Sequence, residues 1–491
     1  AAAGAKGVKG PSARAEFLRS VKKACDRGEA ILVPTAVGLK VPGLQLSVVY
    51  MVEEGPVNGP KKHRKIQDLS EEIDGLGTSV NEATWMLDAP EIGYGETPLK
   101  FLMAVYNALI VYHGGDLAAA KRDVDGAFNR FHVFPGDVAK FAYMVSPGIM
   151  AFMLRLPMGW RRSPANMAIT TDAIARFANA HSVMEVPEAS LELEELHEEN
   201  FVDTLEGEQA FRGIADSLNE GLVLGEGVRV MAFVDDLLAL CLKRHCQGAT
   251  RLLCWSMEQL YRRVDVNEAH YRNEAMSVKK LRSEGAWQWQ IIALGIGYDL
   301  LRGEVFVPEA RRLKLLNLLE TKFGEGTAVA SVKDIQRLTG QCQSLALVKP
   351  QGRFQISRFY GAITGLAGYS SDKIVLNDDF LEELKGWKKW AENAKPVSLH
   401  AVAIRSPTLT GFSDAAGKKD GGMGGYWELG NGTVIWWREI FPLEITDRLT
   451  RDRGEERIGD ITINDLELAG VIANFVVLRQ VLGDEGMRHA V

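Results

Sequence analysis

The feature that most restricts how this chain can fold is the segment from Met231 to Leu240, in which two adjacent carboxylates, Asp235 and Asp236, stand between two apolar runs. Apolar runs this short predict two buried strands, and the Asp-Asp pair predicts a tight hairpin turn between them, because aspartate is common in turns. Two like charges at the end of a buried hairpin cost free energy unless something positive compensates them, and divalent cations are the usual compensation. Taken alone, the pair also fits an exposed acidic turn, so other residues must decide between these interpretations.

The composition is that of a globular protein, with 491 residues of which 46% are hydrophobic and 25% charged. This length allows about two to four domains. Five cysteines without a C-x-x-C pair predict reduced, buried thiols, and therefore an intracellular, reducing compartment. The best apolar run, Phe101 to Tyr112, has twelve residues and is too short to cross a bilayer, so no membrane partner is expected. The first residues include neither a starting Met nor a signal-peptide core, which favours a fragment or a processed polyprotein.

Charge is distributed unevenly along the chain, although the formal net charge is −7. Residues 177–211 contain no Lys or Arg, and most of the stretch 182–208 is strongly acidic. Two sets of basic residues are suited to follow a phosphate backbone, a solvated face being the alternative for each. They are Lys61, Lys62, His63, Arg64 and Lys65, and Lys333, Arg337, Lys349, Arg353 and Arg358. A negative average charge is therefore compatible with nucleic-acid binding.

Helical and strand patterns alternate along the chain in a way that predicts an α+β fold. Helices are expected at Ala15–Arg27, Pro98–Tyr112, Ala165–Asn179, 208–219, Gln247–Val264, Leu313–Lys322, Val332–Leu347, Phe380–Asn393 and Asn464–Leu482. Strands are expected at Leu46–Glu53, Lys65–Leu69, the stretch from Lys121 toward Phe128, Phe141–Leu156 as a pair, Ile291–Tyr298, Glu304–Val307, Thr408–Ser413, Gly424–Leu429 and Thr433–Trp437. Ser163 is the expected N-cap of the helix that follows it, with Pro164 at its first position. A new domain is expected to begin near Ser406.

Asp123 is the partner that the Asp-Asp pair requires. Asp123, Asp235 and Asp236 each lie at a predicted strand end beside a turn, and an Arg-bearing loop, Pro157 to Ala165, lies between them in the sequence. This arrangement predicts a two-metal site for phosphoryl transfer, in which two ions about 4 Å apart need bridging carboxylates. Backbone amides after Asp123 are suited to bind phosphate.

Five motifs follow one another along the chain from Arg64 to Ile296, and together they resemble those of a known protein family. They are the basic region around Arg64, Asp123-x-x-x-Ala-Phe128, Leu156-Pro-Met-Gly-Trp-x-x-Ser-Pro-Ala165, Phe233-Val-Asp-Asp236 and Leu294-Gly-Ile296. The chain thereby resembles the reverse transcriptases of LTR-type and related retroelements, including the DIRS-like group. The resemblance implies a right-hand polymerase, with fingers and palm over 51–305, a thumb and connection over 306–405, and an N-terminal extension, 1–50, without an assigned role. Its implied activity is that of an RNA-directed DNA polymerase, which adds deoxynucleotides to a primer 3′-OH.

The resemblance also implies roles for individual residues. Asp123, Asp235 and Asp236 are the expected catalytic residues and, with the backbone of Val124, the ligands of two Mg²⁺ ions, Mn²⁺ being the alternative metal. The expected deoxynucleotide-binding residues are Lys61, Lys62, Arg64, Val124, Asp125, Gly126, Ala127, Phe128, Met158 and Gly159. The expected primer grip is Leu294, Gly295 and Ile296.

Two of these positions, and a further lysine, have alternatives or depart from the family pattern. Phe128 matches the residue whose ring crowds the sugar 2′-OH, a core aromatic being the alternative. Met158 stands where the retroviral enzymes often carry glutamine, so a polar contact is lost or replaced there. Lys279 or Lys280 matches the lysine that protonates pyrophosphate, a solvated lysine being the alternative.

The C-terminal region, 406–491, resembles a ribonuclease H domain with a truncated α/β fold. Asp414 on a strand and Glu467 on a helix match its first two acidic positions. The chain stops at Val491, before the strand that would carry the next carboxylate, so this domain is expected to be incomplete and inactive. The other departure is the distance of 71 positions between Pro164 and Asp235, which the acidic insertion 182–208 accounts for. Because acidic charge repels nucleic acid, the insertion should point away from the binding groove.

The expected partners are an RNA template, a DNA primer, an RNA:DNA hybrid and deoxynucleoside triphosphates, in the cytoplasm or nucleus within a retroelement ribonucleoprotein. An RNA-dependent RNA polymerase shares the Asp and Asp-Asp arrangement, but Phe128 and the ribonuclease H-like tail argue against it. A decayed or domesticated copy that only binds nucleic acid is the other alternative, which the intact Asp123, Asp235 and Asp236 disfavour.

Overall fold

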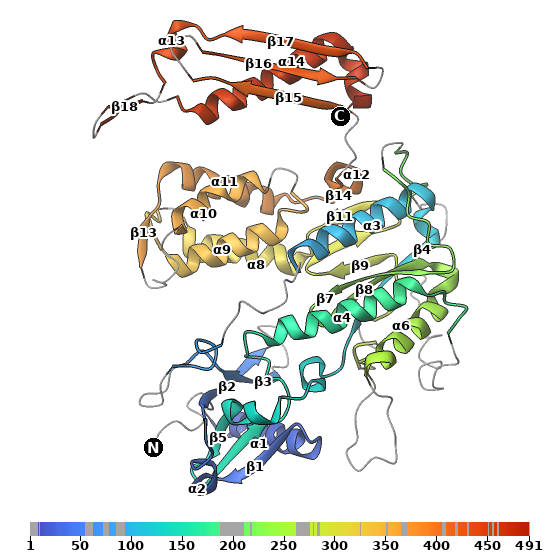
Figure 1. Cartoon of the computed structure of the whole chain (residues 1–491), viewed down its shortest axis with the longest axis vertical. Helices are drawn as coiled ribbons and strands as arrows, with labels where there is room; N and C mark the ends of the chain where they lie inside the picture. Colours follow the sequence, from blue (N-terminus) through green and yellow to red (C-terminus); the bar gives the residue numbers. More distant parts are fainter. Residues whose placement is uncertain are drawn as a thin grey trace. The chain divides into compact units, whose positions relative to one another are not determined.

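The chain forms two compact units in the computed structural model, one of residues 1–215 and 221–403 and the other of 216–220 and 404–491 (Figure 1). The structure describes the chain except for residues 1–7, 9, 55–61, 72–77, 85–93, 187–210, 217–218, 262–274, 278, 282–284, 325, 350–351, 365–371, 405–408, 418–420, 430–431, 450, 454–455, 459–460 and 491. Lys61 and most of the acidic insertion 182–208 therefore lie outside the described residues, and so does the predicted direction of that insertion.

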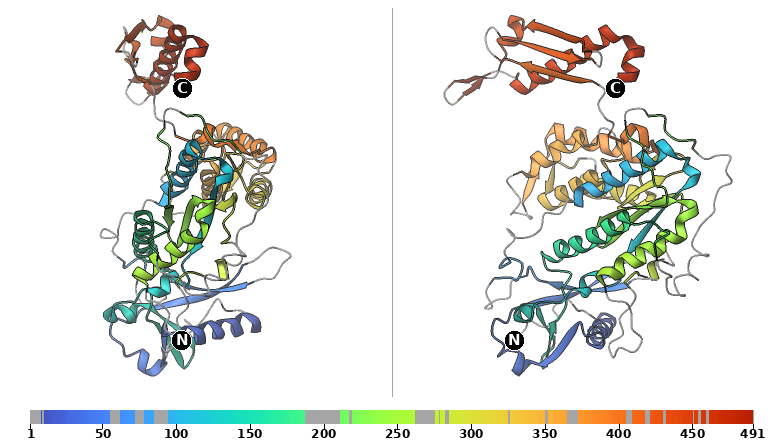
Figure 2. Two further views of the ribbon diagram at one scale, coloured as in Figure 1. Left: turned by 90° about the vertical axis from the view of Figure 1, so that its right-hand side faces the viewer. Right: turned by 45° about the vertical axis from the view of Figure 1, so that its right-hand side comes forward.

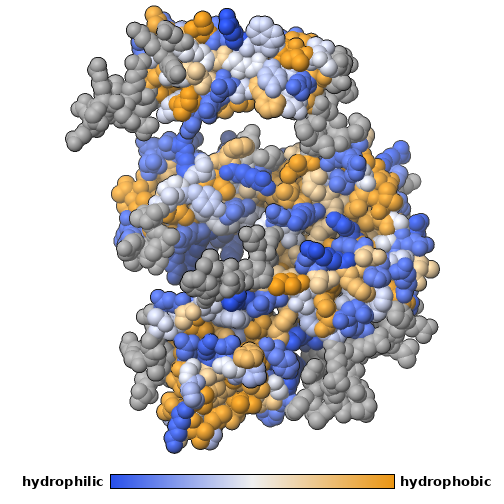
Figure 3. All heavy atoms as spheres, viewed as in Figure 1, coloured by the Kyte–Doolittle hydropathy of each residue, from blue (hydrophilic) through white to orange (hydrophobic). Residues whose placement is uncertain are grey.

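The first unit begins with a five-stranded sheet of order β1-β6-β5-β2-β3. Its strands are β1 (Ala30–Pro34), β2 (Leu46–Glu54), β3 (Lys62–Asp68), β5 (Ala142–Ser146) and β6 (Ile149–Met153). The helix α1 (Pro11–Asp26) has a proline in its first turn and buries Phe17 and Val21 in the core beside this sheet. Exposed apolar side chains gather over β1 and the short helix α2 (Thr35–Gly38), as Figure 3 shows. The predicted strand pair between Phe141 and Leu156 is confirmed.

The second sheet of this unit has the order β4-β8-β7, with β4 (Leu117–Asp123), β7 (Val228–Phe233) and β8 (Asp236–Leu242). Helices α4 (Ser163–Ala180) and α6 (Cys246–Leu260) pack on one face, and α3 (Thr97–Val111) packs on the other (Figure 2). Both faces of β4 and β8 are therefore buried, in agreement with the apolar runs Leu117–Ala120 of β4 and Leu237–Leu242 of β8. β7 is an edge strand and is less buried than the sequence predicts.

The remainder of the first unit follows the order that the sequence predicts. A four-stranded sheet of order β14-β11-β10-β9 contains β9 (Gln290–Ala293), β10 (Ile296–Asp299), β11 (Glu304–Phe306) and β14 (Val397–Ser398). A helical region packs around the buried Trp387 and includes α8 (Glu309–Phe323), α9 (Val332–Leu345), α10 (Ser357–Ile363), α11 (Asp378–Glu392) and the strands β12 (Val329–Ser331) and β13 (Lys373–Val375). The short helix α12 (Leu399–Val402) ends the unit.

The second unit is a small sheet covered by one long helix. Strands β15 (Thr410–Ala415), β16 (Gly422–Glu428) and β17 (Val434–Ile440) form an antiparallel sheet, and α14 (Ile463–Ala490), kinked at Gly483, packs against β15 and β16. The unit also contains α13 (Leu443–Thr446), β18 (Arg451–Arg453) and β19 (Glu456–Ile458).

The segment Ile463–Gly483 of α14 is long and apolar enough to span a membrane by length and composition. The expectation that no apolar run reaches that length is therefore wrong. Leu466, Asn474 and Leu478 of the same helix are buried, as in a core helix that packs on a sheet.

Three local expectations are also wrong. Ser163 does not cap α4, because its hydroxyl donates to Pro157 O at 2.8 Å and so stabilises the preceding loop. The described part of 208–219 contains no helix, because Gly213 has a φ of 106° and Ile214 N donates to Leu109 O at 2.8 Å, which ties this segment to the end of α3. Asp236 is the first residue of β8 rather than part of the turn.

Candidate active site

The three aspartates that were predicted to form the site lie at one end of the sheet, where β4 ends and the turn of the β7–β8 hairpin lies. Asp123 and Asp236 are Cα partners in the register of β4 and β8, which places their side chains on neighbouring strands at the same sheet end. Asp235 follows Val234 in the two-residue turn of the hairpin. Val234 has a φ of 54°, a conformation that a β-branched residue adopts only at a cost.

Two lysines neutralise the buried carboxylates. Lys280 Nζ lies 2.5 Å from Asp123 Oδ1, and Lys121 Nζ lies 3.1 Å from Asp236 Oδ2. Burial raises the pKa of both carboxyl groups, while the neighbouring lysine opposes this shift in each case. Burial lowers the pKa of Lys280, but its hydrogen bond to Asp123 and the charges of the three aspartates outweigh burial and raise it above its ordinary value. Positive charge near the three aspartates therefore stabilises their ionised carboxylates.

Arg122 is a buried residue of this region that the sequence analysis did not single out. Its side chain points to the opposite sheet face from Asp123, where Nη2 donates to Thr250 Oγ1 at 3.0 Å and the guanidinium lies 4.9 Å from the centre of the Trp287 ring. Burial lowers the pKa of Arg122 to about 10. The period of two along β4 is a signal that could have identified it, since buried Ala118 and Ala120 precede it on the same face. The same period places Lys121 beside Asp123.

The carboxylate oxygens of Asp123, Asp235 and Asp236 are hard ligands, which is the type of ligand that Mg²⁺ prefers. Among the described residues, no group of three or more Asp, Glu, His or Cys side chains converges closely enough to hold a metal ion. The ammonium groups of Lys121 and Lys280 instead contact the carboxylates that the sequence analysis assigns to metal. The two-metal assignment therefore stays a prediction.

The predicted nucleotide-binding residues after Asp123 form a tight turn. Gly126 adopts a left-handed φ of 59° and precedes the short 3-10 helix Ala127–Arg130. Arg130 Nε donates to Asp125 O at 2.7 Å, which closes this turn. Phe128 is half-buried and packs against the cores on both sides of the turn, so its ring is fixed by packing.

The basic residues of β3 do not share one environment. Arg64 is exposed, whereas Lys65 points inward and donates to Tyr143 Oη at 3.1 Å. The expectation that Lys65 follows a phosphate backbone is therefore wrong, because strand alternation directs it to the core. The same holds for Lys349, which is buried over the Trp387 ring. Lys61 and the side chain of Lys62 lie outside the described part of the chain.

Met158 and Gly159 lie in the loop that leads into α4. The side chain of Met158 is exposed. Gly159 approaches the strand β3 so closely that a Cβ would lie 2.1 Å from Gln67 O. Glycine is therefore required by backbone packing, whether or not this loop contacts a nucleotide.

The predicted primer grip is the turn of the β9–β10 hairpin. Leu294 and Gly295 both have positive φ, at 52° and 80°, and Ile296 begins β10. A Cβ on Gly295 would lie 2.2 Å from Arg311 Nη1 of α8, so the turn and this helix are closely packed. The expected single strand Ile291–Tyr298 is therefore wrong, because this turn divides it into β9 and β10. The primer-grip function of the turn stays a prediction.

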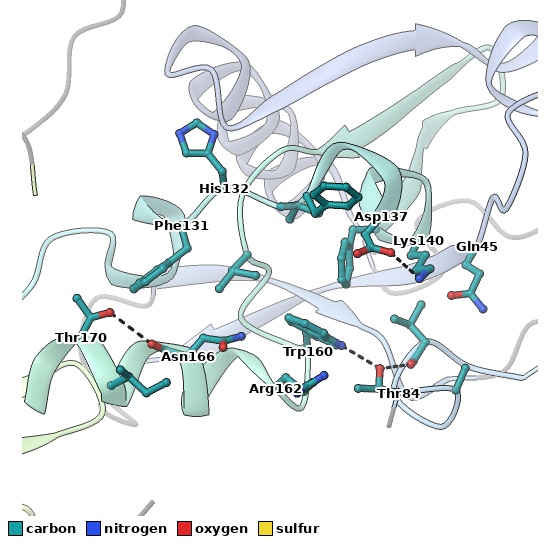
Figure 4. A pocket seen from close by; sticks show the side chains of 17 residues that line it. Gln45, Thr84, Phe131, His132, Asp137, Lys140, Trp160, Arg162, Asn166 and Thr170 are labelled. Carbon is teal, nitrogen blue, oxygen red and sulfur yellow. Dashed lines mark hydrogen bonds and ion pairs between the residues drawn. The ribbon is translucent and has the colours of Figure 1, made fainter. Parts of the chain in front are cut away.

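A larger cavity of about 710 Å³ lies beside the turn after Asp123 and the start of α4 (Figure 4). Its lining includes Phe131, Trp160, Arg162 and Asn166, and Trp160 Nε1 donates to Thr84 Oγ1 at 2.9 Å. Neither Asp123 nor the Asp235-Asp236 pair lines it. The paired carboxylates are the better candidate for chemistry, because among the described residues of the cavity lining the single carboxylate is Asp137, which is paired with Lys140.

In the second unit, Asp414 lies on β15 and Glu467 on α14, two elements that pack together. Both side chains are exposed. Their ribonuclease H-like role stays a prediction.

Comparison with solved structures gives matches of low sequence identity and low TM-score. A foamy viral protease-reverse transcriptase in complex with double-stranded DNA has 12% sequence identity and a TM-score of 0.48, with 97% of this chain and 64% of that chain covered. A second structure of a foamy viral protease-reverse transcriptase with double-stranded DNA gives 12% identity, a TM-score of 0.48 and coverage of 98% and 74%. The structure of such an enzyme with an RNA/DNA hybrid gives 12% identity, a TM-score of 0.45 and coverage of 96% and 49%. No family model and no curated protein matches the sequence. The chain spans less than two thirds of the length of the first of these structures.

Proposed function

We propose that this chain is an RNA-directed DNA polymerase of a retroelement, which adds deoxynucleotides to a primer 3′-OH on an RNA template. The observation that carries the proposal is the pairing of Asp123 with Asp236 at the end of the β4-β8-β7 sheet, with Asp235 in the adjoining turn. In this proposal the region 51–305 forms fingers and palm, 306–405 forms the thumb and connection, and 406–491 is a ribonuclease H-like domain.

Asp123, Asp235 and Asp236 would hold two Mg²⁺ ions, which when bound activate the attacking 3′-hydroxyl and stabilise charge on the leaving pyrophosphate. Lys121 and Lys280 would leave the carboxylates when the ions bind. Lys280 would then approach a phosphate, whose negative charge attracts its ammonium group. Arg64 would bind the triphosphate, since a guanidinium contacts two oxygens at once.

Phe128 would select deoxynucleotides by occupying the space that a 2′-OH needs. Its packing against two cores supports this, because a ring fixed on both sides cannot yield to a larger sugar. Replacement of Phe128 by Ala should raise the use of ribonucleotides relative to deoxynucleotides. Unchanged sugar selectivity, measured with dTTP and UTP on one template, would remove this role.

Primer extension on poly(rA)/oligo(dT) with dTTP and Mg²⁺ tests the proposed activity directly. Asp235→Asn is the matched variant, since it removes one charge and keeps the shape of the side chain. We expect incorporation by the natural chain and a loss of about 100-fold or more in the variant, as for other residues that stabilise charge in a transition state. Equal incorporation by both proteins would refute the active-site assignment. Binding of the hybrid without incorporation by either protein would instead favour a domesticated nucleic-acid-binding protein.

A further inference from the structure

The edge strand β7 has hydrogen-bond partners from side chains on the edge that faces away from β8. In an antiparallel edge strand, every second residue directs both its N–H and its C=O away from the neighbouring strand. Val230 and Ala232 are such residues of β7, because Phe233 pairs with Asp236 across the two-residue turn, and the carbonyl of Val234 belongs to that turn. Their carbonyl oxygens would need either water or a further strand as partners.

Side chains from two helices supply these partners. Asn179 of α4 binds both backbone groups of Val230, donating through Nδ2 to the carbonyl oxygen at 2.9 Å and accepting from the N–H at 2.7 Å. Thr97, the first residue of α3, donates to Ala232 O at 2.9 Å. Thr171 of α4 donates to Val234 O at 2.6 Å. The two outward carbonyls of β7 and the carbonyl of the turn residue Val234 therefore each receive one side-chain donor. Figure 1 shows α4 running beside β7.

The last of these bonds lies at the strained turn. Thr171 is fully buried, and its hydroxyl reaches the carbonyl of Val234, the residue with a φ of 54°. On the other side of the turn, Val124 N donates to Asp235 O at 3.3 Å. The peptide groups of Val234 and Asp235 are thus bound by Thr171 of α4 and by Val124, the residue that follows β4, and these two bonds fix the backbone that carries Asp235.

We infer that Thr97, Thr171 and Asn179 form a side-chain ladder that takes the place of a fourth strand on β7, and that Thr171 is a positioning residue for Asp235. The ladder closes an edge that could otherwise pair with another chain. It also opposes relaxation of the strained turn. The positioning role rests on the proposed function, whereas the ladder itself can be tested without any activity.

The structural test is amide hydrogen exchange in Thr171→Val, which keeps the shape of the side chain and removes the donor. We expect faster exchange of the Val124 amide, because its acceptor, Asp235 O, belongs to the turn that Thr171 fixes. Thr170→Val is the matched control, since the Thr170 hydroxyl donates to Asn166 O within its own helix at 3.4 Å. Unchanged protection of Val124 in Thr171→Val, or equal changes in both variants, would overturn the inference.

The kinetic test separates positioning from a general structural role. We expect Thr171→Val to lower kcat for dTTP incorporation about 10- to 100-fold and to raise the Mg²⁺ concentration for half-maximal rate, because small displacements of a reacting group have effects of this size. The KM for template-primer should not change, and Thr171→Ser, which restores the hydroxyl, should recover most of the rate. Equal losses in the Val and Ser variants, or full activity of Thr171→Val, would refute the positioning role. If Asp235→Asn is as active as the natural chain, the proposed function fails, while the exchange result still decides on the ladder.

Discussion

At the scale of single residues, Lys65 couples the stability of the N-terminal sheet to pH. Burial lowers the pKa of Lys65 from 10.5 to about 8, and the charges of Glu29 and Cys25 oppose this shift. Below pH 8 both the folded and the unfolded chain carry the proton, so the cost of burying the ammonium group is fully present. Between pH 8 and 10.5 only the unfolded chain binds the proton, so the free energy of unfolding increases with pH.

We therefore expect Lys65→Met to be more stable than the natural chain at pH 7, by up to about 3 kcal/mol, and to lose this advantage by pH 10. Lys65→Arg is the control, because a guanidinium stays charged over this range and should gain no stability as pH rises. Urea unfolding at pH 7, 8, 9 and 10, followed by tryptophan fluorescence, measures the differences. A constant difference between the Met variant and the natural chain from pH 7 to pH 10 would contradict the assignment.

At the scale of elements, the sequence predicts most helices and strands, because their apolar periods are clear and their ends carry Pro or Gly. It predicts that Asp123 lies close to Asp235 and Asp236. The reason is that each of the three residues is expected at the end of a strand, and the motifs that contain them follow one another in the expected order. It does not predict the ion pairs of Lys121 and Lys280 with these carboxylates, since side-chain pairing depends on the register of strands far apart in sequence. The missing helix near residue 213 has the same cause: contacts with α3 and Leu301 override the local helical pattern.

The loop before α4 gives a prediction at this scale. Gly159→Ala would place a Cβ 2.1 Å from Gln67 O, so the loop or β3 must move. We expect a destabilisation of about 1–3 kcal/mol, which is usual for overpacking, together with a higher KM for dTTP. Gly148→Ala in the β5–β6 turn is the matched control, because nothing lies within 4 Å of its added Cβ. Thermal unfolding and steady-state kinetics measure both effects, and equal melting temperatures for the two variants would show that the loop adapts without cost.

At the scale of the whole molecule, the two units differ in how much core they contain. Among the described residues of the second unit, the main core cluster has four that are buried, Ala415, Phe441, Leu449 and Leu466, whereas the described part of the first unit has several larger clusters. The helix α14 leaves apolar side chains such as Leu468 and Ile472 exposed within its own unit. A small core with an exposed apolar helix face predicts a unit of low stability.

We therefore expect the chain shortened to residues 1–403 to fold cooperatively and to keep its primer-extension activity, because every residue of the candidate site belongs to the first unit. Calorimetry should show the main transition of the full chain unchanged in the shortened chain, with a second, lower transition present in the full chain alone. Isolated residues 404–491 should bind a hydrophobic dye through the exposed face of α14. Loss of the main transition or of incorporation on shortening would show that the second unit is needed for the fold or for the activity of the first.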